Sequence, residues 1–330
     1  MLILTKEDIE AVCSMEDAIE AVKEAFIIHS EGSVKVPLRI NIRSDKYNGN
    51  MLFMPAYCEQ KDAASLKIVS VYPDNKEKKL PSTPAQVLLI DPSTGIVLSI
   101  LDGTYITALR TGAASGAAFS VLAKSECKMG ALIGTGTQAA MQLEAMITSK
   151  KPKIVKVYSR NKERLNIFVE NMKTKFKSKD VEITASDSAD AAVEEADILI
   201  TATNSDKPLF SARSCKPGLT ISAVGSFTKQ MQELDSTVLK KASKIYYDDK
   251  EAMLEEAGEI IKALENNDID EKKLSGSLGE ALAGKIRLRE NDEEIIVFKS
   301  VGLGTQDLIT AKKVYDNAIS KKIGKHIDIG

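Results

Sequence analysis

The feature that most constrains the fold is the segment GALIGTGTQAA, residues 130–140. Small apolar residues lead into two closely spaced glycines, and helix-forming residues follow. A strand, a tight glycine turn and a helix in this order are typical of a dinucleotide-binding unit. Gly134 would make the turn, Gly136 would let a pyrophosphate approach the backbone, and Ala139 would let the helix pack closely on the strand. The alternative is a glycine-rich turn in an α/β fold with no ligand.

After residue 127, runs typical of strands alternate with helical patterns. The strand-like runs are KIVKVYS, VEITAS, DILITATN, GLTISAVGS and KIYYDD, and a late run, EEIIVFKSVG, follows a long helix that we expect over residues 250–264. This order predicts a parallel sheet with helices on both faces. The segment GTQDLITAKKVYDNAISKKIG is amphipathic, so we expect it to form a helix.

The residues before the glycine segment follow a different pattern. Residues 6–29 carry apolar side chains at helical spacing, whereas LRINIRS, GNMLFMPAY and AASLKIVSVYP read as strands. The run AQVLLIDPSTGIVLSILDG predicts a hairpin, because a DPSTG turn separates two β-branched runs. A helix rich in Ala, Ser and Gly is expected next. The change of pattern near residue 127 therefore separates two regions of the chain.

The composition excludes several kinds of partner and site. The 330 residues have a formal net charge of −2 and no long basic run, so we expect neither nucleic acid nor a membrane as a partner. The first residues, MLILTKEDIEAV, lack the apolar core of a signal peptide. The four separated cysteines suggest reduced thiols in a cytoplasmic protein. Because His29 and His326 are the two histidines, we expect no metal site.

The second strand of the dinucleotide-binding unit predicts which cofactor it prefers. An NAD site usually has Asp or Glu after this strand, where it binds the ribose 2′-hydroxyl. Here Ser159, Arg160 and Asn161 stand at that place. A guanidinium can bind a 2′-phosphate that a carboxylate would repel, so we expect NADP to be preferred, with NAD possible. The alternative is that Arg160 and Lys162 only begin a solvated helix.

Three cations in apolar surroundings suggest a second binding site. Arg39 lies in VPLRINI, Lys67 in ASLKIVSVYPDN and Arg110 in TALRTGAASG. A lysine in such a run lies either at an edge or in a polar pocket. Arg110 lies near the first turn of an expected helix, where the helix dipole disfavours a cation and a bound anion would offset the cost. Together the three residues predict a carboxylate-binding pocket, with structural ion pairs as the alternative.

The chain also resembles a known family. The segments MPAY, LKIVSVYPDN, LDGTYITALRTGAAS, IGTGTQA, AVGSFT with ELD, and VFKSVGLGTQDL occur together and in order. They look like the ornithine cyclodeaminase/mu-crystallin family, and in particular its ketimine reductase-like branch. This resemblance implies a homodimer and a Rossmann NAD(P)-binding domain, residues 116–303. That domain would be inserted into an α+β substrate-binding and dimerisation domain, residues 1–115, which residues 304–330 complete.

The resemblance further implies roles for individual residues. The carboxylate-binding positions of the family correspond to Arg39, Lys67 and Arg110, and Lys67 is also the expected acid/base group. Met54 would line the substrate pocket. The positions that correspond to cofactor contacts are Thr111, Gly134, Gly136, Thr137, Gln138, Ser159, Arg160, Asn161, Thr203, Asn204, Val224, Ser226, Lys299 and Gly302.

Two departures from the family pattern bear on the substrate. Ornithine cyclodeaminase-like and alanine dehydrogenase-like members carry Asp where this chain has Phe227, and the cyclodeaminase carries Glu where this chain has Leu52. The chain therefore lacks the groups that would bind and deprotonate a diamino acid, and an unpaired buried ammonium would be costly. We expect Phe227 to contact the substrate, and its aromatic ring suits an apolar ring better.

The expected function is reduction of a small cyclic imino acid, Δ1-pyrroline-2-carboxylate or Δ1-piperideine-2-carboxylate, by hydride transfer from NADPH to the C=N carbon. Arg39 and Arg110 would fix the carboxylate, and Lys67 would supply a proton or polarise the imine. The enzymatic alternatives are an ornithine cyclodeaminase, which converts L-ornithine to L-proline and ammonia, and an alanine dehydrogenase. An alternative of another class is a non-catalytic NADPH-dependent small-molecule binding protein of the mu-crystallin type.

Overall fold

The computed structural model describes residues 1–328 and divides the chain into two compact units. The first unit consists of Met1–Arg110 and the segment that begins at Leu303, and the second unit is Thr111–Gly302. Helix α3 (Gly103–Leu122) contains one of the two boundaries. The domain boundaries expected from the sequence, 115/116 and 303/304, lie within a few residues of these divisions, and the function of each domain stays a prediction.

The first unit is built on a mixed sheet. Its strands follow the order β16-β1-β7-β6-β5-β4-β2, and β3 pairs with β4. The β1–β7 pair is parallel, and the other pairs are antiparallel. The strands are β1 (Leu2–Leu4), β2 (Val34–Lys35), β3 (Ile40–Ser44), β4 (Gly49–Cys58), β5 (Ala63–Val71), β6 (Ala85–Ile90), β7 (Val97–Asp102) and β16 (Lys325–His326).

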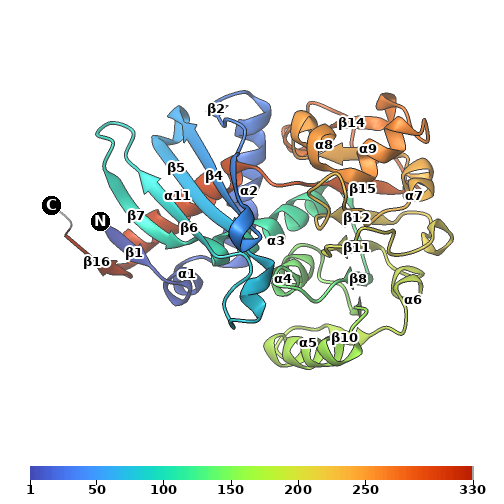
Figure 1. Cartoon of the computed structure of the whole chain (residues 1–330). Helices are drawn as coiled ribbons and strands as arrows, with labels where there is room; N and C mark the ends of the chain where they lie inside the picture. Colours follow the sequence, from blue (N-terminus) through green and yellow to red (C-terminus); the bar gives the residue numbers. More distant parts are fainter. Residues whose placement is uncertain (329–330) are drawn as a thin grey trace. The chain divides into compact units, whose positions relative to one another are not determined.

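Helices α1 (Lys6–Val12), α2 (Met15–Ser30) and α11 (Gly304–Lys321) accompany this sheet. Each of the first two begins with a capping box, Thr5 with Asp8 and Ser14 with Asp17. Figure 1 shows α11, in red, lying along β4, β5 and β6, although it comes from the far end of the sequence. The amphipathic helix expected in the tail is confirmed, and its apolar side is buried.

The hairpin expected around DPSTG is confirmed by the antiparallel pairing of β6 with β7. The carboxylate of Asp91 accepts hydrogen bonds from the backbone N of Ser93 and from the hydroxyls of Ser93 and Thr94. Local side-chain bonds of this kind are the reason why Asp favours turns. The turn therefore fixes the register in which β6 pairs with β7.

The second unit contains a parallel sheet in the order β10-β9-β8-β11-β12-β15-β13-β14. Its strands are β8 (Met129–Ile133), β9 (Ile154–Tyr158), β10 (Glu182–Ala185), β11 (Ile198–Thr201), β12 (Thr220–Ala223), β13 (Lys244–Tyr247), β14 (Leu274–Ser277) and β15 (Ile296–Lys299). Its helices are α4 (Ala139–Lys150), α5 (Lys162–Lys175), α6 (Ala189–Val193), α7 (Ser236–Lys241), α8 (Lys250–Glu256), α9 (Gly258–Glu265) and α10 (Leu278–Leu282), together with the later turns of α3. The short 3-10 helices of the chain are Asp45–Tyr47, Glu59–Lys61, Pro73–Lys76, Ala212–Ser214 and Glu271–Lys273.

Each face of the parallel sheet carries its own hydrophobic core. Alternate residues of β8 divide between them, since Ala131 and Ile133 enter one core and Leu132 enters the other. Helices α6, α7, α8 and α9 cover the first face, and α4 and α5 cover the second. This is the doubly wound arrangement expected from the alternating pattern. The predicted fold class is confirmed.

The single long helix expected over residues 250–264 is wrong, because the structure breaks it at Ala257 between α8 and α9. Ala257 has φ −84° and ψ 92°, which is extended rather than helical backbone. A Cβ at Gly258 would lie 2.2 Å from the carbonyl oxygen of Met231 and 2.6 Å from that of Lys229. The start of α9 therefore packs directly on the 229–231 backbone, and this tertiary contact accounts for the break.

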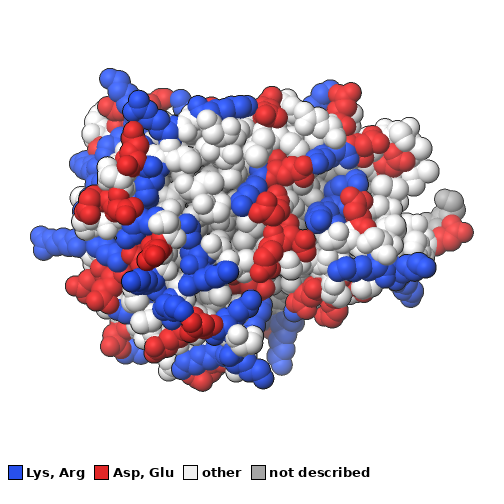
Figure 2. Space-filling model, turned by 180° about the vertical axis from the view of Figure 1, so that it is seen from behind, with Lys and Arg blue, Asp and Glu red and all other residues white. Residues whose placement is uncertain are grey.

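The surface carries charges of both signs. Figure 2 shows Lys and Arg side chains interspersed with Asp and Glu on the face that it displays, with no broad area of a single sign. Within residues 1–328, no helix combines the length and the apolar character needed to cross a bilayer.

Candidate active site

Lys67 lies on the buried face of β5 in the first unit. Alternate residues of this strand, Ala63, Ser65 and Lys67, are buried, and Lys67 is 1% exposed. It lies opposite Met54 of β4 on one side and Val87 of β6 on the other. Because helix α11 packs against these strands, the ammonium of Lys67 is removed from water. A buried ammonium needs a counterion, or it loses its proton more readily.

The counterion is Asp307, which lies in the first turns of α11. Its Oδ2 accepts a hydrogen bond of 2.5 Å from Nζ of Lys67, and its Oδ1 accepts one of 3.1 Å from Nε of Arg110. Asp307 is 1% exposed. A carboxylate near the start of a helix is also stabilised by the helix dipole. We name Lys67, Arg110 and Asp307 the Lys67 cluster.

Gln306 connects the guanidinium of this cluster to the start of α11. Its Oε1 accepts hydrogen bonds of 3.0 Å from Nη1 of Arg110 and from the backbone N of Leu303. Its Nε2 is buried and has no hydrogen-bond partner among residues 1–328. A buried donor without a partner is costly, so an acceptor that reached this position would be stabilised.

The Lys67 cluster holds more positive than negative charge, because Lys67 and Arg110 share one carboxylate. Burial lowers the pKa of Lys67 to about 8; Asp307 works against this shift, whereas the charges of Arg110 and Arg39 add to it. A lysine with such a pKa can release and regain a proton near neutral pH. The surplus cation suits a bound anion such as a carboxylate. The cluster can therefore combine anion binding with proton transfer.

The structure brings most of the predicted substrate residues together within the first unit. Lys67 and Arg110 meet at one carboxylate, and Met54 lies directly opposite Lys67 in the sheet. Arg39 is half-buried and near enough for its charge to lower the pKa of Lys67. Phe227 belongs to the second unit, in the loop after β12, where it is 40% exposed. The roles of these residues toward a substrate stay predictions.

Sequence reasoning missed Asp307 and Gln306 as members of this site. Both residues stand in the GTQDL segment, which we used for the amphipathic helix and for the family resemblance but not for the site. The available signal was polar side chains on a helix turn that is otherwise apolar; in the structure Thr305, Gln306, Asp307 and Thr310 are all fully or almost fully buried. Buried polar residues at the start of a helix demand partners.

In the second unit, the glycine segment connects β8 to α4 at the carboxyl edge of the sheet. Gly134 has φ +113°, and a Cβ there would lie 2.4 Å from the carbonyl oxygen of Ala202. A Cβ at Gly136 would meet no protein atom within 4 Å, so the fold itself does not require glycine there. A bare backbone at Gly136 fits close approach by a ligand phosphate.

The start of α4 offers further groups to a dinucleotide. No side chain caps this helix, and Gln138 at the N-cap has a buried Oε1 with no hydrogen-bond partner in residues 1–328. Uncapped N–H groups at a helix start favour phosphate. Thr137 is exposed beside them. These residues fit a pyrophosphate, and their contact with one stays a prediction.

The loop after β9 holds the residues that we expect to choose between the two dinucleotides. Arg160 is exposed, and Ser159 is partly buried. Asn161 is the N-cap of α5, and its Oδ1 accepts a hydrogen bond of 2.9 Å from the backbone N of Arg164. This oxygen is thus already used by the helix, which leaves Arg160 as the side chain best able to reach an added phosphate.

The loops after β11 and β12 meet at a fully buried carboxylate, that of Glu233. It accepts hydrogen bonds from the backbone N and hydroxyl of Thr203, the hydroxyl of Thr201 and the backbone N of Gly225. Burial raises the pKa of Glu233, which the charge of Lys299 and the Thr203 hydrogen bonds lower in part. Sequence reasoning missed Glu233, although it stands in the ELD segment used for the family resemblance.

Lys299, expected to contact the cofactor, is fully buried beside Glu233. Its Nζ donates a hydrogen bond of 2.6 Å to the backbone O of Ser226 and lies 2.9 Å from Oε1 of Glu259. That ion pair has no well-directed hydrogen bond, and both oxygens of Glu259 lack a hydrogen-bond partner among the residues described. We name Glu233, Glu259 and Lys299 the Glu233 cluster. Lys299 is in a position to support the loop at Ser226, and its direct contact with a cofactor stays a prediction.

Among the other predicted cofactor residues of the second unit, Asn204, Val224 and Gly302 lie in segments that follow strands of this sheet. Asn204 is exposed after β11, and Val224 is partly buried after β12. The backbone N of Gly302 donates a hydrogen bond of 2.7 Å to Asp248, which also accepts from Ser300 and Val301. Thr111 is partly buried in α3. Their contacts with a cofactor stay predictions.

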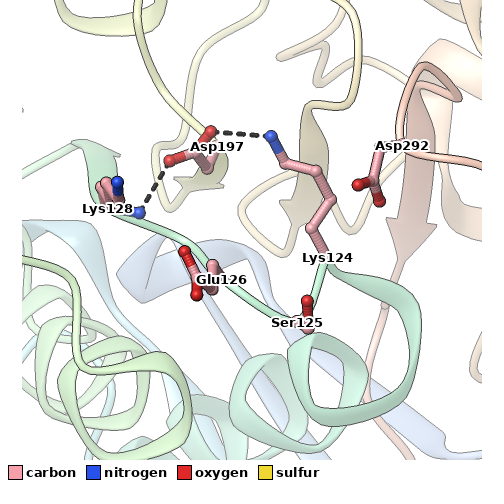
Figure 3. A pocket seen from close by; sticks show the side chains of 6 residues that line it. All are labelled: Lys124, Ser125, Glu126, Lys128, Asp197 and Asp292. Carbon is pink, nitrogen blue, oxygen red and sulfur yellow. Dashed lines mark hydrogen bonds and ion pairs between the residues drawn. The ribbon is translucent and has the colours of Figure 1, made fainter.

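A polar hollow of about 320 Å³ lies at the opposite, amino edge of the parallel sheet and is lined by Lys124, Ser125, Glu126, Lys128, Asp197 and Asp292 (Figure 3). Asp197 is bonded there to Lys124, to Lys216 and to the backbone N of Lys128 and Met129. Burial acts to raise the pKa of Asp197, but these donors prevail and lower it to about 2. Because ligands of open α/β sheets bind at the carboxyl edge, we do not expect the dinucleotide in this hollow.

Comparison with known proteins identifies the family. A family model described as "Ornithine cyclodeaminase/mu-crystallin family" matches residues 1–322. The chain belongs to this family. The family membership and the Rossmann-type domain expected from the sequence are thereby confirmed.

Proteins similar to this chain cover nearly its whole length. A Δ1-pyrroline-2-carboxylate reductase of Bacillus cereus is 35% identical over 328 residues, 99% of this chain and 100% of the relative. The structure of Thermococcus litoralis Δ1-pyrroline-2-carboxylate reductase, in complex with NADH and L-proline, has a TM-score of 0.94 and 41% identity, with 99% and 100% of the two chains covered. An archaeal alanine dehydrogenase dimer with bound NAD has a TM-score of 0.91 and 37% identity, with 100% and 99% covered. With such reductase and dehydrogenase relatives, the chain is an oxidoreductase of this family.

Proposed function

We propose that the chain is an NAD(P)H-dependent reductase of a small cyclic imino acid, with Δ1-pyrroline-2-carboxylate and Δ1-piperideine-2-carboxylate as the candidate substrates. The observation that carries the proposal is the Lys67 cluster. It combines a surplus of buried cations with a lysine whose pKa lies near 8, next to the unpaired amide donor of Gln306. A cyclic imino acid presents both a carboxylate and a nitrogen that must gain a proton.

Residues of this chain would bind the acid and move one proton. Arg110 and Arg39 would bind the carboxylate, since guanidinium groups make charge-assisted hydrogen bonds to both of its oxygens. Lys67 would donate a proton to the imine nitrogen, and Asp307 would orient its ammonium. When bound, NAD(P)H supplies a hydride for the C=N carbon. One hydride and one proton thus convert the C=N bond to CH–NH.

The choice of an imine over a diamino acid rests on two apolar positions. Phe227 and Leu52 stand where related cyclodeaminases have carboxylates, so a distal ammonium would find no counterion there. The relative from Thermococcus litoralis, with L-proline bound, supports a five-membered ring. Alanine dehydrogenation is the second candidate, because the archaeal alanine dehydrogenase is nearly as similar to this chain.

We further propose that NADP is preferred over NAD. Arg160 is exposed in the loop after β9, where its guanidinium can reach an added 2′-phosphate. Asp or Glu, which would bind a free ribose 2′-hydroxyl, does not occur in residues 159–161. The relatives with NADH or NAD bound support a nicotinamide dinucleotide without deciding between the two forms.

A homodimer is part of the proposal. Leu38, Ile40, Ile42 and Tyr47, on or beside the edge strand β3, are 49–64% exposed. Ile40 and Ile42 lie on the same side of the strand, since side chains alternate. An exposed apolar edge strand favours association, and the dimeric relative supports a second copy of this chain as the partner.

Ile40→Glu should reduce the dimer fraction in sedimentation analysis. Ile167→Glu, at an exposed apolar position on α5, is the control and should leave the dimer fraction unchanged.

The test is a cofactor-oxidation screen with purified protein. NADPH and NADH should be oxidised with pyrroline- or piperideine-carboxylate, and NADPH should give the lower KM. Alanine-dependent reduction of NAD would support the second candidate instead. Release of ammonia from ornithine without net NADH would indicate a cyclodeaminase. Tight NADPH binding with no turnover of any imino or amino acid would indicate a binding protein.

A further inference from the structure

Strands β11 and β12 separate at the carboxyl edge of the parallel sheet, where we expect the cofactor to bind. They pair in parallel up to Thr201 and Ala223, and the backbone N of Val224 donates a last hydrogen bond of 3.0 Å to the O of Thr201. Beyond this point the two strands no longer bond each other, so the N–H groups of Thr203 and Gly225 need other acceptors. Both loops carry residues that we expect to bind the cofactor.

The carboxylate of Glu233 fills this gap. Its Oε1 accepts from the backbone N of Thr203 at 2.7 Å and from the hydroxyl of the same residue at 2.9 Å. Its Oε2 accepts from the hydroxyl of Thr201 at 2.9 Å and from the backbone N of Gly225 at 2.8 Å. All four donors come from the two diverging segments, so a single side chain holds both loops at a fixed spacing.

The glycine segment after β8 packs on the same place. A Cβ at Gly134 would lie 2.4 Å from the carbonyl oxygen of Ala202, and a Cβ at Gly225 would lie 2.1 Å from that of Thr203. The loops after β8 and β12 therefore both rest on the Ala202–Thr203 backbone. A shift of the Ala202–Thr203 backbone would therefore displace the loops after β8 and β12 as well.

Lys299 adds a second contact to this support, and Glu259 balances its charge. Lys299 donates to the backbone O of Ser226, one residue beyond Gly225, and its charge is paired with Glu259. Glu259 lies in the first turn of α9, which packs on the 229–231 backbone. Glu259 thus balances the charge of Lys299, and its carboxylate makes no hydrogen bond to any residue among 1–328, whereas Glu233 bonds the loops after β11 and β12 directly.

We propose that Glu233 is a positioning residue for cofactor binding: by bonding Thr203 and Gly225 it fixes the loops after β11 and β12 in the geometry that a nicotinamide dinucleotide requires. The inference rests on the cofactor role in the proposed function and adds a residue to it. A pre-organised binding loop lowers the ordering cost of binding, so loss of Glu233 should weaken the affinity for the dinucleotide.

The experiment compares Glu233→Gln with Glu259→Gln, which removes the same charge from the same cluster. Dissociation constants for NADPH and NADH are measured by fluorescence titration without any substrate. Glu233→Gln places an amide NH2 against donors and should raise both constants about 10- to 100-fold. Glu259→Gln should change them less than about threefold. Equal losses in the two variants, or wild-type affinity in Glu233→Gln, would overturn the proposal.

Hydrogen exchange of the protein without cofactor gives an independent readout. The amides of Thr203 and Gly225 should exchange at least about tenfold faster in Glu233→Gln than in the wild type. Their exchange rates in Glu259→Gln should equal those of the wild type.

If Glu233→Gln does not fold, Thr201→Val is the fallback variant. It removes one of the four hydrogen bonds at nearly constant volume and should weaken dinucleotide binding about threefold. Unchanged affinity in this variant would contradict the proposal. Because neither readout uses an imine, failure of the reductase assignment would be seen separately, as binding without turnover.

Discussion

The two units hold buried ion clusters of opposite composition. In the Lys67 cluster, two cations share the single carboxylate of Asp307. In the Glu233 cluster, two carboxylates surround the single ammonium of Lys299. The surplus carboxylate of Glu233 is used by four donors of its own chain, whereas we propose that the surplus positive charge of Lys67 and Arg110 binds the carboxylate of a substrate. In this account one cluster is a binding site and the other is a support.

The largest effect should come from Lys67→Met. Loss of the Lys67 ammonium removes the proton donor. The value of kcat should therefore fall about 1000-fold or more, within the range of general acid catalysis. Stability should change little, because Arg110 still pairs with Asp307. Steady-state kinetics and thermal unfolding measure the two effects. Lys61→Met, at a partly exposed ion pair with Glu24, is the control. Retained turnover in Lys67→Met would remove the catalytic role.

Lys299→Met, unlike Lys67→Met, should strongly reduce the folding stability of the protein. It leaves Glu259 buried without a counterion, which costs about 3–5 kcal/mol in the free energy of unfolding. The double variant Lys299→Met with Glu259→Leu should recover a large part of this loss, since a neutral apolar pair replaces the ion pair. Urea denaturation gives the comparison. If Lys299→Met unfolds as the wild type does, the two clusters do not differ as described.

Asp307→Asn should shift the pH dependence of the reaction. Asp307 is the group that raises the pKa of Lys67 against burial, so its loss should move that pKa below about 8. The acid acts only while protonated, so the fall in kcat/KM on the basic side should begin at lower pH than in the wild type. Profiles from about pH 6 to about pH 10 would show this shift. A basic limb at the wild-type position would disconnect Asp307 from the proton donor.

The smallest effect concerns the choice of cofactor. Arg160→Asp should raise the KM for NADPH about tenfold and leave the KM for NADH similar or lower, because a carboxylate repels a 2′-phosphate. Lys162→Asp, at the first position of α5, is the matched control and should leave the ratio of the two KM values within about twofold. A wild type that prefers NADH would end the argument for Arg160.

The fold of the second unit could be predicted from the sequence more completely than the Lys67 cluster of the first unit. The segment around Gly134 and Gly136 gives the strand, turn and helix within a dozen residues, and this local order suffices for a Rossmann-type unit. Lys67 and Arg110 were also visible, as cations in apolar runs. Asp307 lies 240 residues from Lys67 and meets it only because α11 packs on β5. No local pattern in the sequence could have paired them.

Two further features depend on contacts between distant segments. Glu233 acts on Thr203 and Gly225 through a loop, and its position in the sequence carries no periodic signal. The break between α8 and α9 follows from the packing of Gly258 on the 229–231 backbone, whereas the local sequence favours one continuous helix. In both cases tertiary packing overrides or supplements local preference.

Transfer of deuterium tests the central claim most directly. NADPH deuterated at C4 of the nicotinamide, on the transferred side, is incubated with Δ1-pyrroline-2-carboxylate and the wild-type protein. We predict proline that carries deuterium at its α-carbon, detected by mass spectrometry, and formed at least about 1000-fold more slowly with Lys67→Met. Unlabelled proline, or no proline while alanine or ornithine is consumed, would contradict the assignment of the chain as an imino acid reductase.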